Sequence, residues 1–152
     1  MAYSGLFRPQ HPEKYRGRVD QVVWRSLWEL NYFKRLDTNP DVLEWSSEET
    51  VIPYQSTDGK IHKYFPDLRF TIRQPDGTLK TFLVEIKPLF ETLPPMRTKP
   101  VRTQRQYQRL LKETDTFLKN QSKWKAAREW CARHDMEFVL LTEKELFPGR
   151  TV

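Results

Sequence analysis

Three residues whose side chains can support hydrolytic chemistry lie close together in the sequence. Asp67 follows a proline in YFPDLRF, and Glu85 and Lys87 are two residues apart in FLVEIKP. Because side chains alternate across a strand, Glu85 and Lys87 share one face while Val84 and Ile86 take the other. The two carboxylates offer hard oxygen ligands for Mg²⁺, and the backbone carbonyl of Ile86 is a candidate third ligand. A lysine beside the ion can orient or deprotonate a water, which suits phosphodiester hydrolysis.

An ordinary salt bridge is the alternative explanation of these residues. The pattern E-x-K is common on strand surfaces, where an acid and a lysine pair across neighbouring strands. The residues around this pair are strongly apolar, however, in FLVEI. An acid and a lysine in such surroundings face a desolvation cost unless they bind something.

The elements that position these residues follow from the apolar pattern and the turn residues. Capping-box spacing between Ser26 and Glu29 predicts a helix that starts at Ser26. The Asp76-Gly77 turn predicts an antiparallel hairpin. The expected order is a helix to about Leu36, a strand over 42–54 broken near SSEE, a turn at Asp58-Gly59, hairpin strands over 64–72 and 81–86, a helix from Val101 to about His134 with a break near Asn120, and a strand over 138–142.

These elements predict an α/β (α+β) fold. We expect a mixed β-sheet with the 64–86 hairpin at its centre and helices on both faces. The fully apolar strand FVLLT should pair beside the E-x-K strand, since such a strand suits a buried position. Residues 1–19 are polar and proline-containing and are predicted to be an N-terminal arm, and residues 20–152 a single domain.

Composition excludes several classes of protein. The 152 residues suffice for one domain, and no run of about eighteen apolar residues predicts a membrane span. The first residues lack the apolar core of a secretory signal, so an intracellular protein is expected. One cysteine and three scattered histidines exclude disulfide and multi-cysteine metal sites, and five isolated glycines leave no loop for a nucleotide cofactor.

The positive charge is concentrated in one segment. Residues 97–133 contain eleven Lys or Arg and three acids, whereas the rest of the chain carries a small net negative charge. Such focusing favours a polyanion partner, double-stranded DNA above all. Lys119 and Lys123 share a helix face, and Arg102 and Arg105 begin a second basic stripe, so these four are candidate phosphate contacts. A solvated helix face is the alternative.

Taken together, these motifs resemble the PD-(D/E)xK nuclease superfamily. The segments WRSLWELNYFKRLDTNPDVLEWSSEE, IPYQSTDGKIHKYFPDLRF and FLVEIKP are most similar to the head-completion nucleases of tailed bacteriophages, relatives of the TnsA-type transposition endonucleases. The similarity resumes at FLKNQSKWKAAREWC and FVLLTEKEL, so it covers most of the chain. It implies a restriction-endonuclease-like core.

The resemblance also implies roles for single residues. Asp67 and Glu85 would be metal ligands, Lys87 the catalytic lysine, and Glu29 the acid of the first helix that helps to bind a second metal or its water. For Glu29 the capping box is the competing explanation, and Glu48 is a further candidate acid. The implied cofactor is Mg²⁺, with Mn²⁺ as an alternative.

Three functions therefore remain open. The first is a metal-dependent DNA endonuclease that processes packaged DNA ends, with phage head or portal proteins as partners, in the host cytoplasm during assembly or in the virion. The second is a DNA-binding structural head-completion protein with a vestigial nuclease site. The third is a non-catalytic interaction module, which would need an exposed apolar patch.

Overall fold

The computed structural model describes residues 4–96 and 99–146. The expectations for residues 1–3, Arg97 and residues 147–152 lie outside the described residues. None of the described helices is long and apolar enough to cross a bilayer. In chain order the strands and α-helices are β1 (Gly5–Leu6), β2 (Val23–Trp24), α1 (Leu27–Thr38), β3 (Val42–Ser47), β4 (Ile52–Gln55), β5 (Ile61–Tyr64), β6 (Leu68–Arg73), β7 (Leu79–Ile86), α2 (Gln104–Arg133), β8 (Glu137–Leu141) and α3 (Glu143–Leu146).

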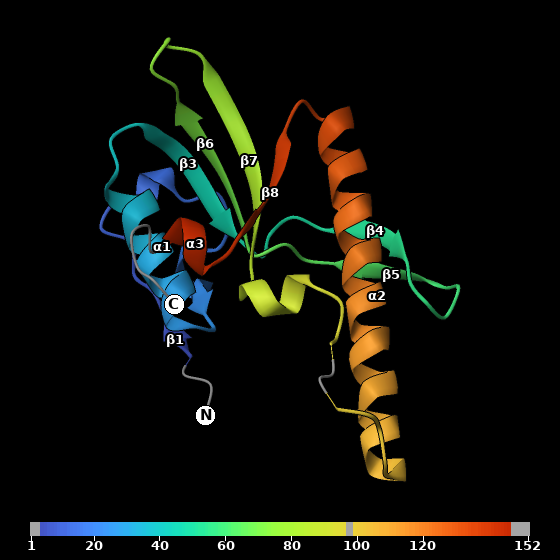
Figure 1. The fold of residues 1–152 in the computed structure, drawn as a ribbon. Helices are drawn as coiled ribbons and strands as arrows, with labels where there is room; N and C mark the ends of the chain where they lie inside the picture. Colours follow the sequence, from blue (N-terminus) through green and yellow to red (C-terminus); the bar gives the residue numbers. More distant parts are fainter. Residues whose placement is uncertain (1–3, 97–98, 147–152) are drawn as a thin grey trace.

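A four-stranded mixed sheet forms the centre of the molecule (Figure 1). Its order is β3-β6-β7-β8, with antiparallel pairing of β3 to β6 and β6 to β7 and parallel pairing of β7 to β8. The expected mixed sheet and the place of FVLLT beside the E-x-K strand are thus confirmed. β7 is buried at its end because it lies between two strands and beneath two helices.

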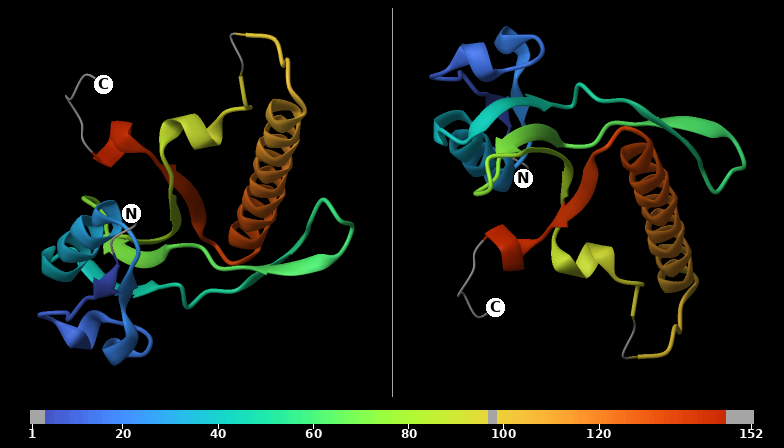
Figure 2. Two further views of the ribbon diagram at one scale, coloured as in Figure 1. Left: turned by 90° about the horizontal axis from the view of Figure 1, so that it is seen from below. Right: turned by 90° about the horizontal axis from the view of Figure 1, so that it is seen from above.

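The helices cover opposite faces of this sheet (Figure 2). On one face, Phe33 and Leu36 of α1 pack with Val84 and Ile86 of β7. On the other, Trp124, Ala127 and Cys131 of α2 pack with Leu83. Consecutive residues of β7 therefore belong to different cores, as alternation along a strand requires.

The first helix begins as its sequence predicts. Ser26 is the N-cap, and its Oγ accepts a hydrogen bond from the backbone N–H of Glu29 at 3.1 Å. The helix extends to Thr38, two residues beyond the expected end, and stops before Pro40, whose ring cannot continue it. Its broad apolar arc places Phe33 against Trp45, which is 1% exposed.

The expected strand over 64–72 is in fact two strands. β5 ends at Tyr64 and β6 begins at Leu68, with Phe65, Pro66 and Asp67 between them. Pro66 has no N–H to donate to a ladder, so pairing stops there. β5 turns away and pairs with β4 as a separate ribbon through the Asp58-Gly59 turn, where Gly59 has a φ of +79°.

The expected break in the long helix does not occur. α2 is continuous over 30 residues, and Thr103 and Gln106 form a capping box at its start. Asn120 lies on the half-buried side of the helix, where its backbone stays in the helical ladder. The weak helix propensity of Asn is overridden by the packing of Trp124 and Ala127 just beyond it.

The N-terminal segment is packed on the core, although its polar sequence suggested an arm. Tyr15 is 5% exposed, and its hydroxyl accepts a hydrogen bond from the Ser47 N–H at 3.1 Å. The Arg16 N–H donates to the Trp45 carbonyl at 2.8 Å, which covers the free edge of β3. Two aromatic residues, Phe7 and Tyr15, supply the apolar surface that holds the segment.

Asp37 fastens this segment to α1. Its carboxylate is buried and accepts hydrogen bonds from the backbone N–H groups of Gln10 and His11 at 2.7 and 3.0 Å.

We expect Asp37→Ala to lower the free energy of unfolding by about 2–3 kcal/mol, because two amides lose a charged acceptor. The matched control Asp41→Ala removes an exposed acid next to the same helix and should cost less than about 0.5 kcal/mol. Urea unfolding measures both, and equal losses would contradict the anchoring role.

Candidate active site

Asp67 is held between the start of β6 and the end of β7. It immediately precedes Leu68, and its Oδ2 accepts a hydrogen bond from the backbone N–H of Ile86 at 2.7 Å. The Asp67 carbonyl in turn accepts the N–H of Glu48, which follows β3, at 3.2 Å. Three strand ends therefore meet at this aspartate.

Glu85 and Lys87 point to the α2 face of the sheet, as alternation along the strand predicted. Their side chains approach one another, with Lys87 Nζ 3.9 Å from Glu85 Oε1. Glu85 is 7% exposed, and its Oε2 accepts a hydrogen bond from the buried Tyr64 hydroxyl at 2.9 Å. Lys87 Nζ also lies 3.9 Å from Glu91 Oε2, so the amine stands between two carboxylates.

Glu29 reaches the same region from α1. Its Oε2 accepts the backbone N–H of Arg25 at 3.2 Å, so the side chain partly caps the helix. The side chain is half-buried, and burial, followed by the charge of Asp67, raises its pKa. The capping role and a position beside Asp67 are therefore compatible.

Burial and mutual repulsion raise the pKa of all three acids. Desolvation, followed by the Asp67 charge, raises the pKa of Glu85 to about 8 and that of Glu29 to about 7. Desolvation raises the pKa of Asp67 to about 6, although the Ile86 N–H and Lys87 oppose the change. The positive charge near these acids is therefore too small to compensate all three carboxylates when they are ionised.

The acids of this site are of the chemical type that binds divalent cations. Asp67 and Glu85 lie at the junction of β6 and β7, where Asp67 Oδ2 accepts the Ile86 N–H and Glu85 immediately precedes Ile86, and hard oxygens are what Mg²⁺ prefers. Among the described residues, no group of three or more His, Cys, Asp or Glu side chains is placed so that it could hold a metal ion. Water or backbone oxygen would have to supply the other ligands, as Mg²⁺ sites commonly require. Ile86 contacts the site through its N–H.

The four predicted DNA contacts lie in two places, with Lys119 and Lys123 in the middle of α2 and Arg102 and Arg105 at or just before its start. Lys123 is half-buried, with Nζ 5.8 Å from the ring centres of both Tyr54 and Tyr64, next to Glu85. Lys119 is one turn away and forms an ion pair with Asp115 at 3.1 Å. Arg102 and Arg105 are exposed near the start of the helix, several turns from Lys123.

Two features of the site were not predicted from the sequence. The Tyr64 hydroxyl bonds Glu85, and Arg25 forms a bidentate pair with Glu48 at 2.9 and 3.2 Å. Arg25 and Glu48 both influence the pKa of Asp67. The position of Tyr64 before Pro-Asp was visible, but its partner depends on how β5 leaves the sheet. Glu48 has a positive φ of 55°, a strained backbone conformation that its residue type does not predict.

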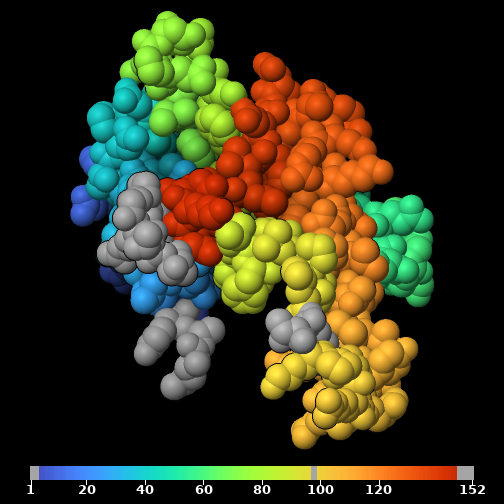
Figure 3. Space-filling model, in the orientation of Figure 1, coloured from blue at the N-terminus to red at the C-terminus, as the bar shows by residue number. Residues whose placement is uncertain are grey.

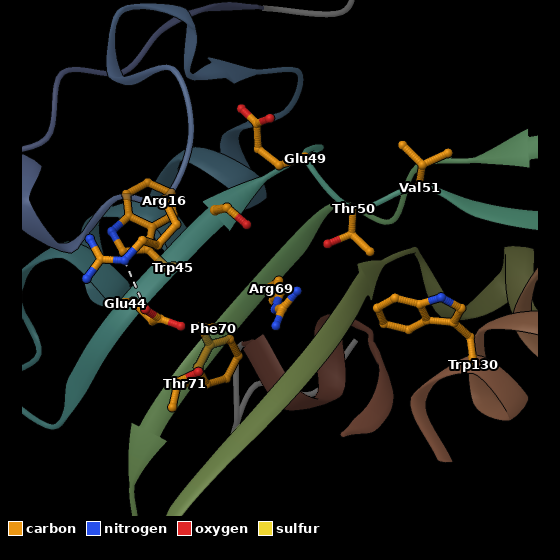
Figure 4. A pocket seen from close by; sticks show the side chains of 11 residues that line it. Arg16, Glu44, Trp45, Glu49, Thr50, Val51, Arg69, Phe70, Thr71 and Trp130 are labelled. Atoms are coloured by element: carbon orange, nitrogen blue, oxygen red, sulfur yellow. Dashed lines mark hydrogen bonds and ion pairs between the residues drawn. The ribbon is translucent and has the colours of Figure 1, made fainter. Parts of the chain in front are cut away.

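A cavity of about 420 Å³ opens elsewhere, on the face of β3 and β6 (Figure 4). Arg69 lies near its middle, Trp130 at one side, and the ion pair of Arg16 with Glu44 at the other. None of the predicted catalytic residues lines this cavity. The carboxylate cluster, not the cavity, is therefore the candidate active site.

The raised pKa values predict that the metal-free protein becomes less stable as pH rises. Between the unfolded pKa of about 4 and the folded values of about 6 to 8, the folded state binds more protons than the unfolded state. We expect stability in EDTA to fall by about 2–4 kcal/mol from pH 5 to pH 8. Denaturant unfolding at both pH values measures this, and Glu85→Gln should flatten the dependence. A dependence as steep in Glu85→Gln as in the parent would contradict the assignment.

The chain is similar to known nucleases over most of its length. Residues 39–143 match the family model described as TnsA-like endonuclease N terminal, a range that contains Asp67, Glu85 and Lys87. The chain is 39% identical over 147 residues to the head completion nuclease of Enterobacteria phage T4, which covers 96% of this chain and 95% of that protein. No solved structure matches the chain significantly. The match to the family model over most of the chain, together with this relative, confirms the resemblance: the protein belongs to the TnsA-like endonuclease family.

Proposed function

We propose that this family member is a Mg²⁺-dependent DNA endonuclease whose reaction centre is formed by Asp67, Glu85 and Lys87. The observation that carries the proposal is the junction of β6 and β7, where Asp67 bonds the Ile86 N–H and Glu85 lies 3.9 Å from Lys87. Buried like charges with raised pKa values are costly, and a bound cation would offset that cost. Mn²⁺ would substitute for Mg²⁺, because it accepts the same ligands.

The biological setting is proposed from the phage T4 relative, which is named a head completion nuclease. By this analogy the chain would process the ends of packaged double-stranded DNA, with phage head or portal proteins as partners. It would act in the host cytoplasm during assembly or within the virion.

In this mechanism Asp67 and Glu85 would hold the ion, with the Ile86 carbonyl as a candidate further ligand, and Glu29 would bind a second ion or its water. A bound metal would supply Lewis-acid stabilisation of the phosphate and would lower the pKa of its water. The Tyr64 hydroxyl fixes one oxygen of Glu85, and the Ile86 N–H fixes one oxygen of Asp67. Both carboxylates are thereby held before any substrate arrives, which reduces the reorganisation that the reaction needs.

Lys87 completes the centre as a positioned cation. Its amine lies between Glu85 and Glu91, at 3.9 Å from each, so neither distance is that of a tight ion pair. An amine held in this way can donate to a water or to a phosphate oxygen without first breaking a short bond. Lys87 would therefore orient the attacking water or stabilise negative charge on the phosphate.

Substitutions at the centre should abolish cleavage while leaving DNA binding intact. We expect Asp67→Ala and Lys87→Ala each to lower plasmid nicking in Mg²⁺ by at least about 10³-fold, since each removes a group that acts on the reacting phosphate. DNA affinity in EDTA should change less than about threefold, because the basic helix is untouched. Nicking assays with fluorescence anisotropy on the same samples measure both quantities.

Matched controls use exposed residues of the same charge. Asp76 and Lys60 lie in the turns of the two hairpins, away from the carboxylates. The variants Asp76→Ala and Lys60→Ala should therefore nick plasmid as the parent protein does. Parental activity in Asp67→Ala would overturn the catalytic assignment. DNA binding without nicking in the parent, with Mg²⁺ and with Mn²⁺, would instead favour the structural head-completion protein with a vestigial site.

A further inference from the structure

Five basic residues form one continuous stripe along α2. Successive members are four, three, seven and four residues apart, close to whole numbers of helical turns, so they share one face. The unbroken helix joins what the sequence suggested were two separate basic stripes. This α2 stripe consists of Arg105, Arg109, Lys112, Lys119 and Lys123.

The amino-terminal part of α2 contributes little to the core. Its residues from Gln104 to Thr114 are exposed except for Leu110, whereas the fully buried residues of the helix begin at Trp124. Figure 3 shows this part of the helix projecting from the main body beside the end of the preceding loop. About three turns of helix with a basic face are thus held out in solvent.

The outer end of the stripe keeps its charge available. Among the described residues, Arg105 and Lys112 have no ion-pair partner. Arg109 pairs with Glu113 at 3.1 Å and Lys119 with Asp115 at 3.1 Å, and all four of these side chains are at least 44% exposed. Exposed pairs of this kind are weak, so phosphates can displace the acids.

The inner end of the stripe reaches the candidate active site. Lys123 Nζ lies over the ring of Tyr64, and the hydroxyl of that tyrosine is bonded to Glu85. The stripe therefore starts beside the proposed reaction centre and runs away from it along one straight element. From Lys123 to Arg105 the helix rises by about 27 Å.

We propose that the α2 stripe binds the phosphate backbone of a duplex DNA arm that extends to one side of the scissile phosphate. This inference rests on the proposed function and adds the direction of the substrate. A length of about 27 Å corresponds to about eight base pairs at 3.4 Å each. The two rings that adjoin the stripe, Tyr54 and Tyr64 beside Lys123, are buried, whereas surfaces for single strands combine cations with accessible aromatic rings on which the bases stack.

The first test measures binding in EDTA, where the DNA stays intact. Arg105→Ala with Lys112→Ala removes two unpaired cations, and alanine favours the helix. By fluorescence anisotropy, we expect this variant to bind a fluorescein-labelled 24-bp duplex at least about tenfold more weakly at ~100 mM salt. The slope of log affinity against log salt concentration should become less steep by about 1.8. The matched control Arg73→Ala with Lys125→Ala removes the same residue types off the stripe and should bind like the parent.

Three results of this test would overturn the proposal. One is equal loss of affinity in the stripe variant and the control. Another is a 24-nucleotide single strand that binds as tightly as the duplex and depends equally on Arg105 and Lys112. The last is labelled poly-glutamate that binds the stripe as tightly as the duplex does, which would indicate an acidic protein partner.

A second test establishes direction. The native Cys131 is buried, so Gln108→Cys offers one exposed thiol beside the stripe for a tethered iron–EDTA probe. We expect hydroxyl-radical cuts centred about seven base pairs to one side of the enzyme's own cleavage position. Cuts on both sides, or at the cleavage position itself, would overturn the one-sided arm.

The two proposals fail in different ways. Absence of nicking under all metal conditions would contradict the proposed endonuclease activity. The binding measurements in EDTA would still test the α2 stripe. If the stripe variant nicks normally and binds DNA like the parent, the proposed DNA arm is wrong, whereas the proposed reaction centre is unaffected.

Discussion

The hydrogen bond from the Ile86 N–H to the Asp67 carboxylate is the contact on which the candidate site depends. It joins the residue before β6 to the last residue of β7, at the point where the two strands cease to pair. Because β7 also pairs with β8, Ile86 is fixed within a buried ladder, and Asp67 is fixed with it. Glu85 is adjacent on the same strand, so one rigid segment positions both carboxylates.

Electrostatic repulsion then gives this rigid arrangement its chemical character. Burial places Glu85, Asp67 and Glu29 where ionisation is unfavourable, and the charge of Asp67 raises the free energy of the ionised forms of Glu29 and Glu85. Lys87, at 3.9 Å from Glu85, offsets only part of this repulsion. The fold thus holds buried carboxylates with too little neighbouring positive charge, and a divalent cation would supply that charge. Acids with pKa values perturbed in this way are typical of functional sites.

The two halves of α2 show how one helix can serve both packing and binding. Its second half supplies Trp124, Ala127 and Cys131 to the core and so holds Lys123 beside Tyr64. Its first half projects and carries charge without contributing to the core. The polar face of that half is compatible with a stable helix because the capping box at Thr103 and the packed half together hold it in register.

The sequence by itself determined the elements, the alternation that puts Glu85 and Lys87 on one face, the mixed sheet and the family, since local periodicity, turn residues and motif order are all properties of neighbouring residues. It misjudged the N-terminal segment and the continuity of α2, because Tyr15, Trp124 and Ala127 pack against residues far away in the sequence. Only the tertiary structure brought Tyr64 to Glu85 and Glu29 to Asp67. Those contacts depend on where β5 leaves the sheet and how α1 crosses it, and no local pattern specifies the direction of a chain after it departs from a ladder.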